Sequence, residues 1–325
     1  MSAFAARAEL IEDGGAAAAA EGQFFRSRPF LEAEGVTHTL RIESEEGELV
    51  GPLIVREIEG TGERDAISPY GYPGFHSPVP SWGLATEGNR RATVDPAAID
   101  FAATGLVTAF VRHSLGPSPL AGASERNVVQ IADPELPPKS RPSDRRQVRR
   151  NLEAGYAVDL VLGTETTPDQ RAGFRAVYEQ TMRRTDAAPH YFFDTAYFDR
   201  VLDAGRTWLA LATAADGTLA AASIAAVSDG YLHYYLSGSA DSHLRQAPMK
   251  NVVTRLVDHS TELGLPLNLG GGIAPGDALE EFKRGFANRQ QPWLTSELIC
   301  DPGTYARLSR GREAGSFFPA YRAGS

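Results

Sequence analysis

The second half of the sequence orders its helical and extended segments in a way that few folds share. Hydrophobic periodicity predicts two helices, a three-stranded meander, and then helix, strand, helix and strand. These segments lie near 168–183, 194–204, 207–214, 219–227, 230–238, 247–263, 266–270, 277–285 and 293–299. The strands begin antiparallel, so the pattern indicates a mixed α/β (α+β) fold and argues against the regular alternation of a doubly wound sheet.

The first half repeats this pattern in a weaker form. Two extended runs within 38–59 are joined by Glu46-Gly47, which is typical of a hairpin. Residues 95–115 are predicted to form a helix that begins at Asp95, with Pro96 in its first position. We therefore expect two domains of similar build, which agrees with a length of 325 residues.

The clearest boundary along the chain follows Pro137 and Pro138, where Ser143 is predicted to cap a helix. The first residues are rich in alanine and glycine and give no regular pattern. The expected division is a flexible leader over 1–22, a first domain over 23–145, a second domain over 146–304, and a tail over 305–325 that could pack back on the first domain.

Composition narrows the kind of protein. One cysteine, Cys300, excludes an internal disulfide framework and a multi-thiolate metal site, and it favours the reducing cytoplasm. The seven histidines show no ligand spacing, so no metal is expected. No segment reaches the roughly 20 apolar residues that span a bilayer. A net charge of −9 makes a general polyanion-binding surface unexpected, although a local basic groove is allowed.

Five short stretches, taken together, resemble the FemABX family. They are SPYGYPG (68–74), RRQVRRN at the start of the second half, YEQTMRRTDA followed by HYFF (178–193), YLHYYLSGS (231–239), and LNLGGG leading to EFKRGF (281–286). The resemblance implies two tandem GNAT-like acyltransferase domains that transfer an amino acid from aminoacyl-tRNA to an amine. The coiled-coil arm of some members is absent, because no sustained heptad interrupts residues 151–310.

The resemblance places Lys283, in EFKRGF, beside the reacting carbonyl. The reaction passes through a tetrahedral oxyanion, and a lysine offers a compact charge suited to a developing alkoxide. Only three of the 32 basic residues are lysines, which favours Lys283 over its neighbour Arg284. Phe282 is the second catalytic candidate; with Phe286 it lines one helical face, as core packing or as a channel wall.

Aromatic and basic residues in the same motifs are candidates for acceptor binding. The resemblance implies that an arginine at the end of the 168–183 helix grips the acceptor, and that tyrosines line the site. The loop tyrosines could instead be packing anchors, and the member of each adjacent pair that faces the substrate stays open. The candidates are Tyr70, Tyr72, Arg183, Arg184, Tyr191, Tyr234 and Tyr235.

Residues 139–150 hold six basic residues and one acid, a net charge of +5. Such a run is often a solvated helix face, but with tRNA as the carrier it is the best candidate for phosphate contact. The candidates for phosphate contact are Arg145, Arg149, Arg150 and, more weakly supported, Lys250.

Coenzyme A is disfavoured as the donor, and no cofactor is expected. GNAT enzymes bind the pyrophosphate of CoA through backbone amides of a [QR]xxGx[GA] loop. The corresponding stretch, SADSHLRQAPMKN (239–251), has no glycine after its Arg-Gln pair, and Pro248 has no N–H to donate.

The function expected from these residues is a cytoplasmic aminoacyl-tRNA-dependent aminoacyltransferase. Its acceptor would be an amine of a cell-wall muropeptide precursor or of a peptide-like secondary metabolite. Two alternatives stay open. One is an acyl-CoA-dependent N-acyltransferase, which measurable CoA binding would favour. The other is a non-catalytic double-GNAT protein that binds a peptide or a nucleotide.

Overall fold

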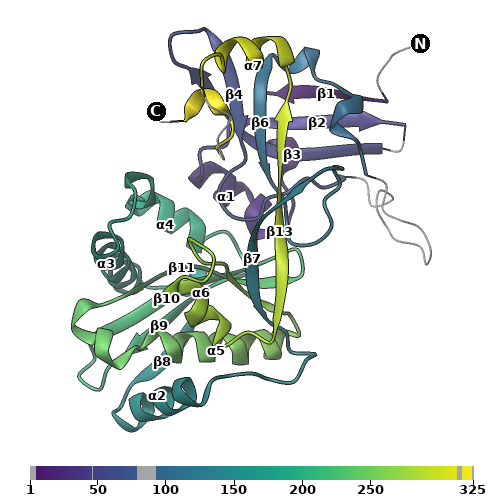
Figure 1. Cartoon of the computed structure of the whole chain (residues 1–325). Helices are drawn as coiled ribbons and strands as arrows, with labels where there is room; N and C mark the ends of the chain where they lie inside the picture. Colours follow the sequence, from purple (N-terminus) through teal and green to yellow (C-terminus); the bar gives the residue numbers. More distant parts are fainter. Residues whose placement is uncertain (1–4, 46, 79–92, 313–316, 324–325) are drawn as a thin grey trace. The chain divides into compact units, whose positions relative to one another are not determined.

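The computed structural model describes residues 5–45, 47–78, 93–312 and 317–323. The chain divides into two compact units (Figure 1). Unit 1 comprises Met1–Glu21, Phe25–Arg126 and Trp293–Ser325, and unit 2 comprises Gly22–Phe24 and Asn127–Pro292. The chain leaves unit 1 within strand β7 (Ser124–Ala132) and returns to it within strand β13 (Arg289–Ile299).

Unit 1 is built on a mainly antiparallel sheet. Its strands, besides the last part of β13, are β1 (Ala6–Ile11), β2 (His38–Ser44), β3 (Gly47–Ile58), β4 (Glu63–Ile67), β5 (Ile99–Asp100) and β6 (Leu106–Arg112). Their order is β5-β1-β2-β3-β4-β6-β13, and only β5 with β1 and β4 with β6 pair in parallel. Helices α1 (Arg28–Ala33) and α7 (Pro302–Leu308) belong to the same unit.

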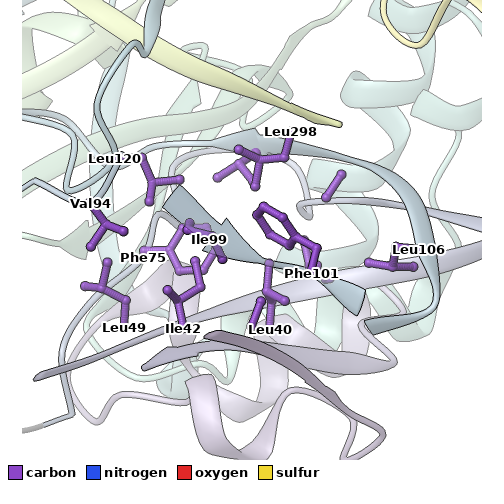
Figure 2. Close-up of a cluster of buried hydrophobic side chains, with 14 of the residues drawn as sticks. Leu40, Ile42, Leu49, Phe75, Val94, Ile99, Phe101, Leu106, Leu120 and Leu298 are labelled. Carbon is purple, nitrogen blue, oxygen red and sulfur yellow. The ribbon is translucent and has the colours of Figure 1, made fainter. Parts of the chain in front are cut away.

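The core of unit 1 is an aliphatic and aromatic cluster (Figure 2). Leu40 and Ile42 alternate along β2 and so point to the same face, where they meet Leu49 of β3. All three are at most 1% exposed, and Leu298 of β13 joins them. Burying each of these side chains stabilises the unit by about 2 kcal/mol.

The strands of unit 2 have helices on both faces. Its elements, besides β7, are α2 (Pro142–Glu153), β8 (Ala157–Leu162), α3 (Pro168–Arg184), α4 (Thr195–Leu202), β9 (Thr207–Thr213), β10 (Leu219–Ser228), β11 (Tyr231–Ser239), α5 (Met249–Leu263), β12 (Leu267–Gly270) and α6 (Ala278–Arg284). The strand order is β7-β12-β11-β10-β9-β8. Strands β8 to β11 are antiparallel, whereas β11 and β12 pair in parallel.

The two faces of this sheet differ in the size of their side chains. Helix α5 packs Val252, Val253 and Leu256 against alanines of β9 and β10, and these small residues allow the helix to approach closely. On the opposite face, α3 and α4 (Figure 1) hold an aromatic cluster in which the ring centroids of Phe174 and Phe198 are 5.4 Å apart. Both faces of the strands are therefore buried.

The element order predicted for the second half is confirmed. Helix α3 begins after Thr167, whose hydroxyl accepts the N–H of Gln170 while the Gln170 side chain accepts the N–H of Thr167. The meander β9-β10-β11 and the elements α5, β12, α6 and β13 follow in the expected order. The hairpin β2-β3 is also confirmed, and Glu46 in its turn lies outside the described residues.

The prediction of a flexible leader over 1–22 is wrong. Strand β1 lies between β5 and β2 in the sheet of unit 1. Ala6 and Ala8 alternate with exposed residues and are at most 6% exposed, so this alanine-rich segment has the period of a strand. The alanine-rich composition of the segment led to the wrong prediction, because it was considered without this alternation.

Two further strands, β7 and β8, were also absent from the sequence prediction.

The helix predicted over 95–115 is also wrong. Asp95 does cap a turn, because its Oδ1 accepts the N–H of Ala97 at 2.9 Å, but the turn is a single 3-10 helix over Pro96–Ala98. The rest of the range contains β5 and β6. The β-branched and aromatic residues of β6 favour an extended strand that pairs on both sides, with β4 and β13.

The predicted cap at Ser143 is wrong by two residues. The N-cap of α2 is Arg141, because Pro142 occupies the first helical position and Ser143 the second. The sequence places the domain boundary at residue 145, which falls inside α2. The whole of α2 lies in unit 2. The tail belongs to unit 1, where the hydroxyls of Tyr321 and Thr108 are 2.7 Å apart.

Candidate functional site

Lys283 is a buried cation in unit 2. Helix α6 begins after Asp277, whose Oδ1 accepts the N–H of Glu280 at 2.7 Å. Lys283 lies in the last turn of this short helix and is 8% exposed. Its Nζ donates a 2.6 Å hydrogen bond to the carbonyl oxygen of Gly271. Helix α6 and the loop after β12 thus hold an ammonium group in a defined position.

The charge of Lys283 is only weakly compensated. Burial lowers the pKa of Lys283 from 10.5 to about 8, and the negative charge of Asp277 opposes this shift. Among the residues that the structure describes, none places a carboxylate in contact with Nζ. Lys283 is therefore protonated at neutral pH, with a charge that can still interact with an incoming anion.

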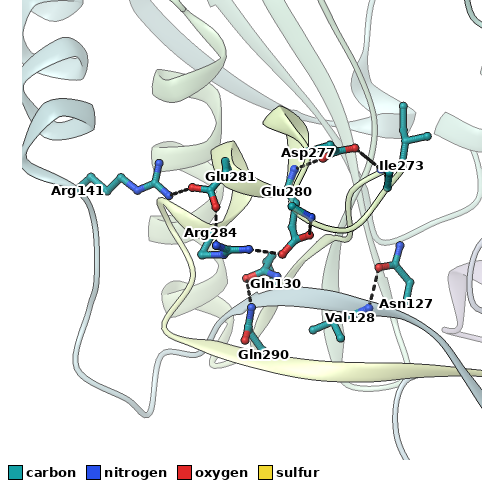
Figure 3. Close-up of polar contacts among 12 residues, drawn as sticks. Asn127, Val128, Gln130, Arg141, Ile273, Asp277, Glu280, Glu281, Arg284 and Gln290 are labelled. Carbon is teal, nitrogen blue, oxygen red and sulfur yellow. Dashed lines mark hydrogen bonds and ion pairs between the residues drawn. The ribbon is translucent and has the colours of Figure 1, made fainter.

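The loop that receives Lys283 depends on close backbone approach. A Cβ atom on Gly271 would lie 2.6 Å from Nδ2 of Asn127, and one on Gly272 would lie 2.4 Å from Oδ1 of Asp277. Asn127 Nδ2 donates to the carbonyl oxygen of Gly272 at 3.0 Å, and Asp277 Oδ2 accepts the N–H of Ile273 at 2.7 Å (Figure 3). Glycine at both positions allows these bonds to form.

The neighbouring cation, Arg284, is bound very differently. Its guanidinium pairs with Glu280 and Glu281 on its own helix, and Arg141 donates a 2.8 Å bond to Glu281 (Figure 3). Two carboxylates therefore neutralise Arg284, whereas Lys283 contacts a neutral carbonyl. The preference for Lys283 over Arg284 as the catalytic cation stays a prediction.

The two tyrosines of β11 point to opposite faces of the sheet. Tyr234 packs against the cluster that Val252, Val253 and Leu256 of α5 form with the sheet, which we call the α5 cluster. Its hydroxyl donates to Ser237 Oγ at 2.6 Å, and burial raises the pKa of Tyr234 to about 12. The hydroxyl of Tyr235 is 2.6 Å from that of Tyr197 in α4, and its ring meets Phe24 edge-on. Both hydroxyls thus have partners within unit 2.

The N-terminus of α5 is largely occupied by the chain itself. The N–H groups of Lys250 and Asn251 bond to the carbonyl oxygens of Ala247 and Pro248 at 3.0 and 2.9 Å. From α2, Gln147 and Asn151 donate side-chain bonds of 3.1 and 2.8 Å to the carbonyl oxygen of Gln246. Helix α2 is therefore fixed against the loop that precedes α5.

Comparison with known proteins identifies the fold. Residues 139–284 match the model of the acetyltransferase (GNAT) domain. FemX is similar in structure, with a TM-score of 0.55 and 11% identity over 83% of this chain and 90% of FemX. L-PGS from Bacillus licheniformis gives a TM-score of 0.56 and 12% identity over 84% of this chain and 87% of that protein. No curated protein matches the sequence.

The chain has a GNAT-like fold that is similar to that of FemX. The GNAT domain covers α2 to α6, and Lys283 lies at its end. The domain match and the fold together support a transferase of the GNAT type.

The basic candidates for phosphate contact differ in the partners of their charges. Lys250 Nζ pairs with the buried Asp144 Oδ1 at 2.8 Å. Arg145 donates to the carbonyl oxygen of Ser140, and Arg149 forms an exposed 3.6 Å pair with Glu153. These arginines and the exposed Arg150 stay on the surface of α2, whereas Lys250 links the start of α5 to α2 through its pair with Asp144.

The arginine pair at the end of α3 divides into one anchored and one exposed residue. Arg184 pairs with Asp241 and donates a 3.3 Å bond to the carbonyl oxygen of Ser239, so it holds the end of β11. Arg183 forms a 2.8 Å pair with Glu179 and its side chain is 66% exposed. Of the two, Arg183 is the more accessible to a ligand.

The aromatic candidates of the GNAT domain are in contact with its core. Phe282 packs against Phe286, with ring centroids 5.5 Å apart, at the edge of the α5 cluster. The carbonyl oxygen of Tyr191 accepts a 2.9 Å bond from the hydroxyl of Tyr178, and the Tyr191 ring lies 4.2 Å from that of His190.

Tyr70 and Tyr72 belong to unit 1. The ring of Tyr72 meets those of Phe25 and Trp293 edge-on, each at a centroid distance of 5.4 Å, which makes Tyr72 a packing anchor. Tyr70 is 42% exposed, and its N–H donates to Glu34 Oε2 at 2.8 Å. The other sequence-predicted site residues all lie in unit 2.

Sequence reasoning missed the residues that shape the Lys283 site. Asn127 and Asp277 position the glycine loop, and neither belongs to a motif by itself. Asp277, at the start of the predicted helix near 277–285, could have been recognised as its cap. Among the described residues, no group of three or more His, Cys, Asp or Glu side chains could hold a metal ion. In that same part of the chain, no helix is long and apolar enough to cross a membrane.

Proposed function

We propose that this protein is an aminoacyl-tRNA-dependent aminoacyltransferase that forms an amide bond on an amine acceptor. The acceptor is an amine of a cell-wall muropeptide precursor or of a peptide-like secondary metabolite. The FemABX-like fold and the ordered motifs support this proposal. The observation that carries it is the buried ammonium of Lys283, bonded to the carbonyl of Gly271 and free of any carboxylate contact within the described residues.

The proposed chemistry requires positioning and one positive charge. The acceptor amine attacks the ester carbonyl of the charged tRNA, so a carbon–nitrogen bond forms and the carbonyl oxygen becomes negative. When the tetrahedral intermediate collapses, the carbon–oxygen bond to the ribose breaks, and the proton lost by the amine ends on the ribose hydroxyl. Lys283 would stabilise the oxyanion, because a fixed charge in a low-dielectric site needs little reorganisation during the reaction.

The geometry of Lys283 suits this role. An ammonium group has three N–H donors, and the carbonyl of Gly271 takes one of them. That bond fixes the direction of the side chain without neutralising its charge. The pKa of about 8 keeps the donor protonated at neutral pH and makes it a stronger acid than an exposed lysine.

The start of α5 supports tRNA over CoA as the donor. A GNAT enzyme that uses CoA needs free backbone amides at this position. Here the N–H groups of Lys250 and Asn251 bond within their own turn, and Pro248 has none. Side chains of α2 also occupy the preceding loop at Gln246. The exposed cations of α2, of which Arg150 is one, would contact the phosphates of the tRNA instead.

One observation favours a second candidate. The domain matched by residues 139–284 is described as an acetyltransferase domain, and the buried Lys283 could serve an acyl-CoA donor equally well. An acyl-CoA-dependent N-acyltransferase is therefore the alternative that the experiment has to separate.

The test is transfer of a radiolabelled amino acid to a panel of amines. Three donors are compared: intact charged tRNA, the same tRNA after ribonuclease treatment, and labelled acetyl-CoA. The proposal expects an amide product from intact charged tRNA and none from acetyl-CoA. Product from acetyl-CoA alone, with calorimetric binding of CoA, would overturn it. Ligand binding without turnover on any donor would point to a non-catalytic binding protein.

A further inference from the structure

Two cavities of unit 2 adjoin each other. One is an apolar groove of about 680 Å³ between α2, α5 and the segment that follows β7. The other is a polar cavity of about 520 Å³ at the start of β13. Lys139 and Asn288 line both, so the two spaces meet at these residues. Lys283 lines neither of them.

The floor of the groove offers a ligand little hydrogen bonding. The hydroxyls of Thr254 and Thr261 donate to the carbonyl oxygens of Lys250 and Val257 at 2.8 and 3.0 Å. Asn288 Oδ1 accepts the N–H of Asp133 at 2.8 Å, and its Nδ2 donates to the Asp133 carbonyl at 2.9 Å. Because these polar groups are already satisfied, the groove favours an apolar ligand over a nucleobase or a sugar.

The walls of the groove expose unusual apolar area. Leu152 on α2 is 56% exposed and Leu136 is 40% exposed. Pro134, Val148 and Val257 line the same space. When a ligand covers exposed leucines that line one concave space, the removal of their apolar surface from water favours binding.

The polar cavity has the opposite character. It is lined by cations and amides: Lys139, Arg284, Arg289, Gln130, Asn288 and Gln290. Gln130 is completely buried, and its Oε1 accepts a 3.2 Å bond from Gln290 (Figure 3). Its Nε2 has no hydrogen-bond partner among the described residues. A buried donor without a partner is costly, and a ligand oxygen in this cavity would satisfy it.

Of the three cations that line the polar cavity, Lys139 is the one without a carboxylate partner among the described residues. Arg284 pairs with Glu280 and Glu281, and Arg289 Nε lies 3.0 Å from Asp133 Oδ2. Lys139, by contrast, forms no ion pair with any residue that the structure describes, and it is exposed where the groove and the cavity meet. Arg145 and Arg149 add positive charge along the groove.

We propose that unit 2 binds an amphiphile with a phosphate headgroup, its alkyl chain in the groove and its phosphate in the polar cavity. Phosphate fits because its several acceptor oxygens can take bonds from both Lys139 and Gln130 Nε2, and the cation–amide lining favours an anion. The alkyl chain fits the satisfied, aliphatic floor. This site goes beyond the proposed function, since binding there requires neither tRNA nor Lys283.

Calorimetric titration below the micelle concentration tests the proposal with three probes. Dodecyl phosphate carries both parts, dodecyl maltoside has the same chain without charge, and inorganic phosphate has no chain. We expect dodecyl phosphate to bind at least about tenfold more tightly than dodecyl maltoside. It should bind more than about a hundredfold more tightly than inorganic phosphate, because each buried methylene changes Kd about fourfold.

Two variants and a matched control locate the site. Lys139→Gln should weaken dodecyl phosphate about tenfold and leave dodecyl maltoside unchanged. Leu152→Gln should weaken both alkyl probes severalfold, and its exposed position spares the fold. Arg146→Gln removes an exposed cation of α2 that lines neither cavity, and it should leave the affinity for both alkyl probes unchanged.

Each contrary outcome is distinct. Equal affinity for the two alkyl probes would mean a general apolar surface and would overturn the proposal, as would no binding of dodecyl phosphate. If Lys139→Gln weakens tRNA binding and leaves dodecyl phosphate binding unchanged, the polar cavity serves nucleic acid instead. The titration uses no donor substrate, so failure of aminoacyl transfer leaves its result interpretable.

Discussion

Each unit of this protein buries an ionised side chain, and the two are treated in opposite ways. In unit 1, Asp65 is completely buried and accepts bonds from Arg56 Nε at 3.0 Å, from Arg322 Nε at 2.5 Å and from the hydroxyl of Tyr321 at 3.2 Å. In unit 2, Lys283 is 8% exposed and bonds to one neutral carbonyl oxygen.

We interpret this difference as one between a structural charge and a charge that is available to a ligand. A buried charge whose hydrogen bonds and counter-charges all come from the fold is fully compensated, so a ligand gains little by contacting it. A buried charge with one neutral partner is poorly compensated for its loss of water, which is why burial lowers the pKa of Lys283. We therefore expect Asp65 to stabilise the fold and Lys283 to take part in the chemistry.

The largest effect on stability is expected at Asp65. Asp65→Ala leaves Arg56 and Arg322 without their common carboxylate, and the free energy of unfolding should fall by about 3 kcal/mol, less than for fully buried partners because both arginines are partly exposed. Urea unfolding measures the change. Asp65→Asn, which retains hydrogen-bond acceptance, is the matched control and should lose less. A loss below about 1 kcal/mol for the alanine variant would refute the structural role.

Lys283 should make stability depend on pH. Because its pKa is about 8 when folded and 10.5 when unfolded, the unfolded chain binds the extra proton between these values. The contribution of Lys283 to the free energy of unfolding is therefore constant below about pH 8. It rises by about 2 kcal/mol between about pH 8 and about pH 9.5.

Urea unfolding of the wild type and of Lys283→Met across this pH range isolates the contribution, since other titrating groups are common to both. The wild type should gain stability relative to the variant as pH rises. Parallel pH profiles would mean that Lys283 titrates as an exposed lysine.

A smaller effect distinguishes the two arginines of α3. Arg184→Ala removes the contacts with Asp241 and Ser239 and should cost about 1 kcal/mol of unfolding free energy. Arg183→Ala breaks only an exposed pair with Glu179 and should cost less than about 0.5 kcal/mol. Thermal unfolding of the two variants side by side checks the order, and a reversed order would assign the anchoring role to Arg183.

The sequence contained the order of elements from α3 to β13, because α3 and β9 to β11 have clear periods and a capping box marks Thr167. It gave no signal for β7 and β8, which precede α3. It concealed β1, where Ala6 and Ala8 are too small to give a strong hydrophobic signal. It also concealed β6, whose neighbour β13 lies far along the chain. Strand pairing of this kind depends on distant residues and leaves no local pattern.

For the site, local motifs pointed to Lys283 but could not supply its surroundings. The carbonyl of Gly271 and the side chain of Asn127 reach the site from other segments of the chain. Lys250 shows the limit of the same reasoning, because the sequence did not indicate that Asp144 would pair with it. A local motif indicates which side chain lies at a position, but it does not indicate which distant residue contacts that side chain.

The central claim is that Lys283 supplies the positive charge for aminoacyl transfer. Single-turnover transfer from charged tRNA to the acceptor amine tests it in the wild type, in Lys283→Met, and in Arg206→Met, which removes an exposed cation of unit 2. We expect Lys283→Met to remain folded by circular dichroism and to react at least about thirtyfold more slowly, and Arg206→Met to react at the wild-type rate. An unchanged rate in folded Lys283→Met would contradict it.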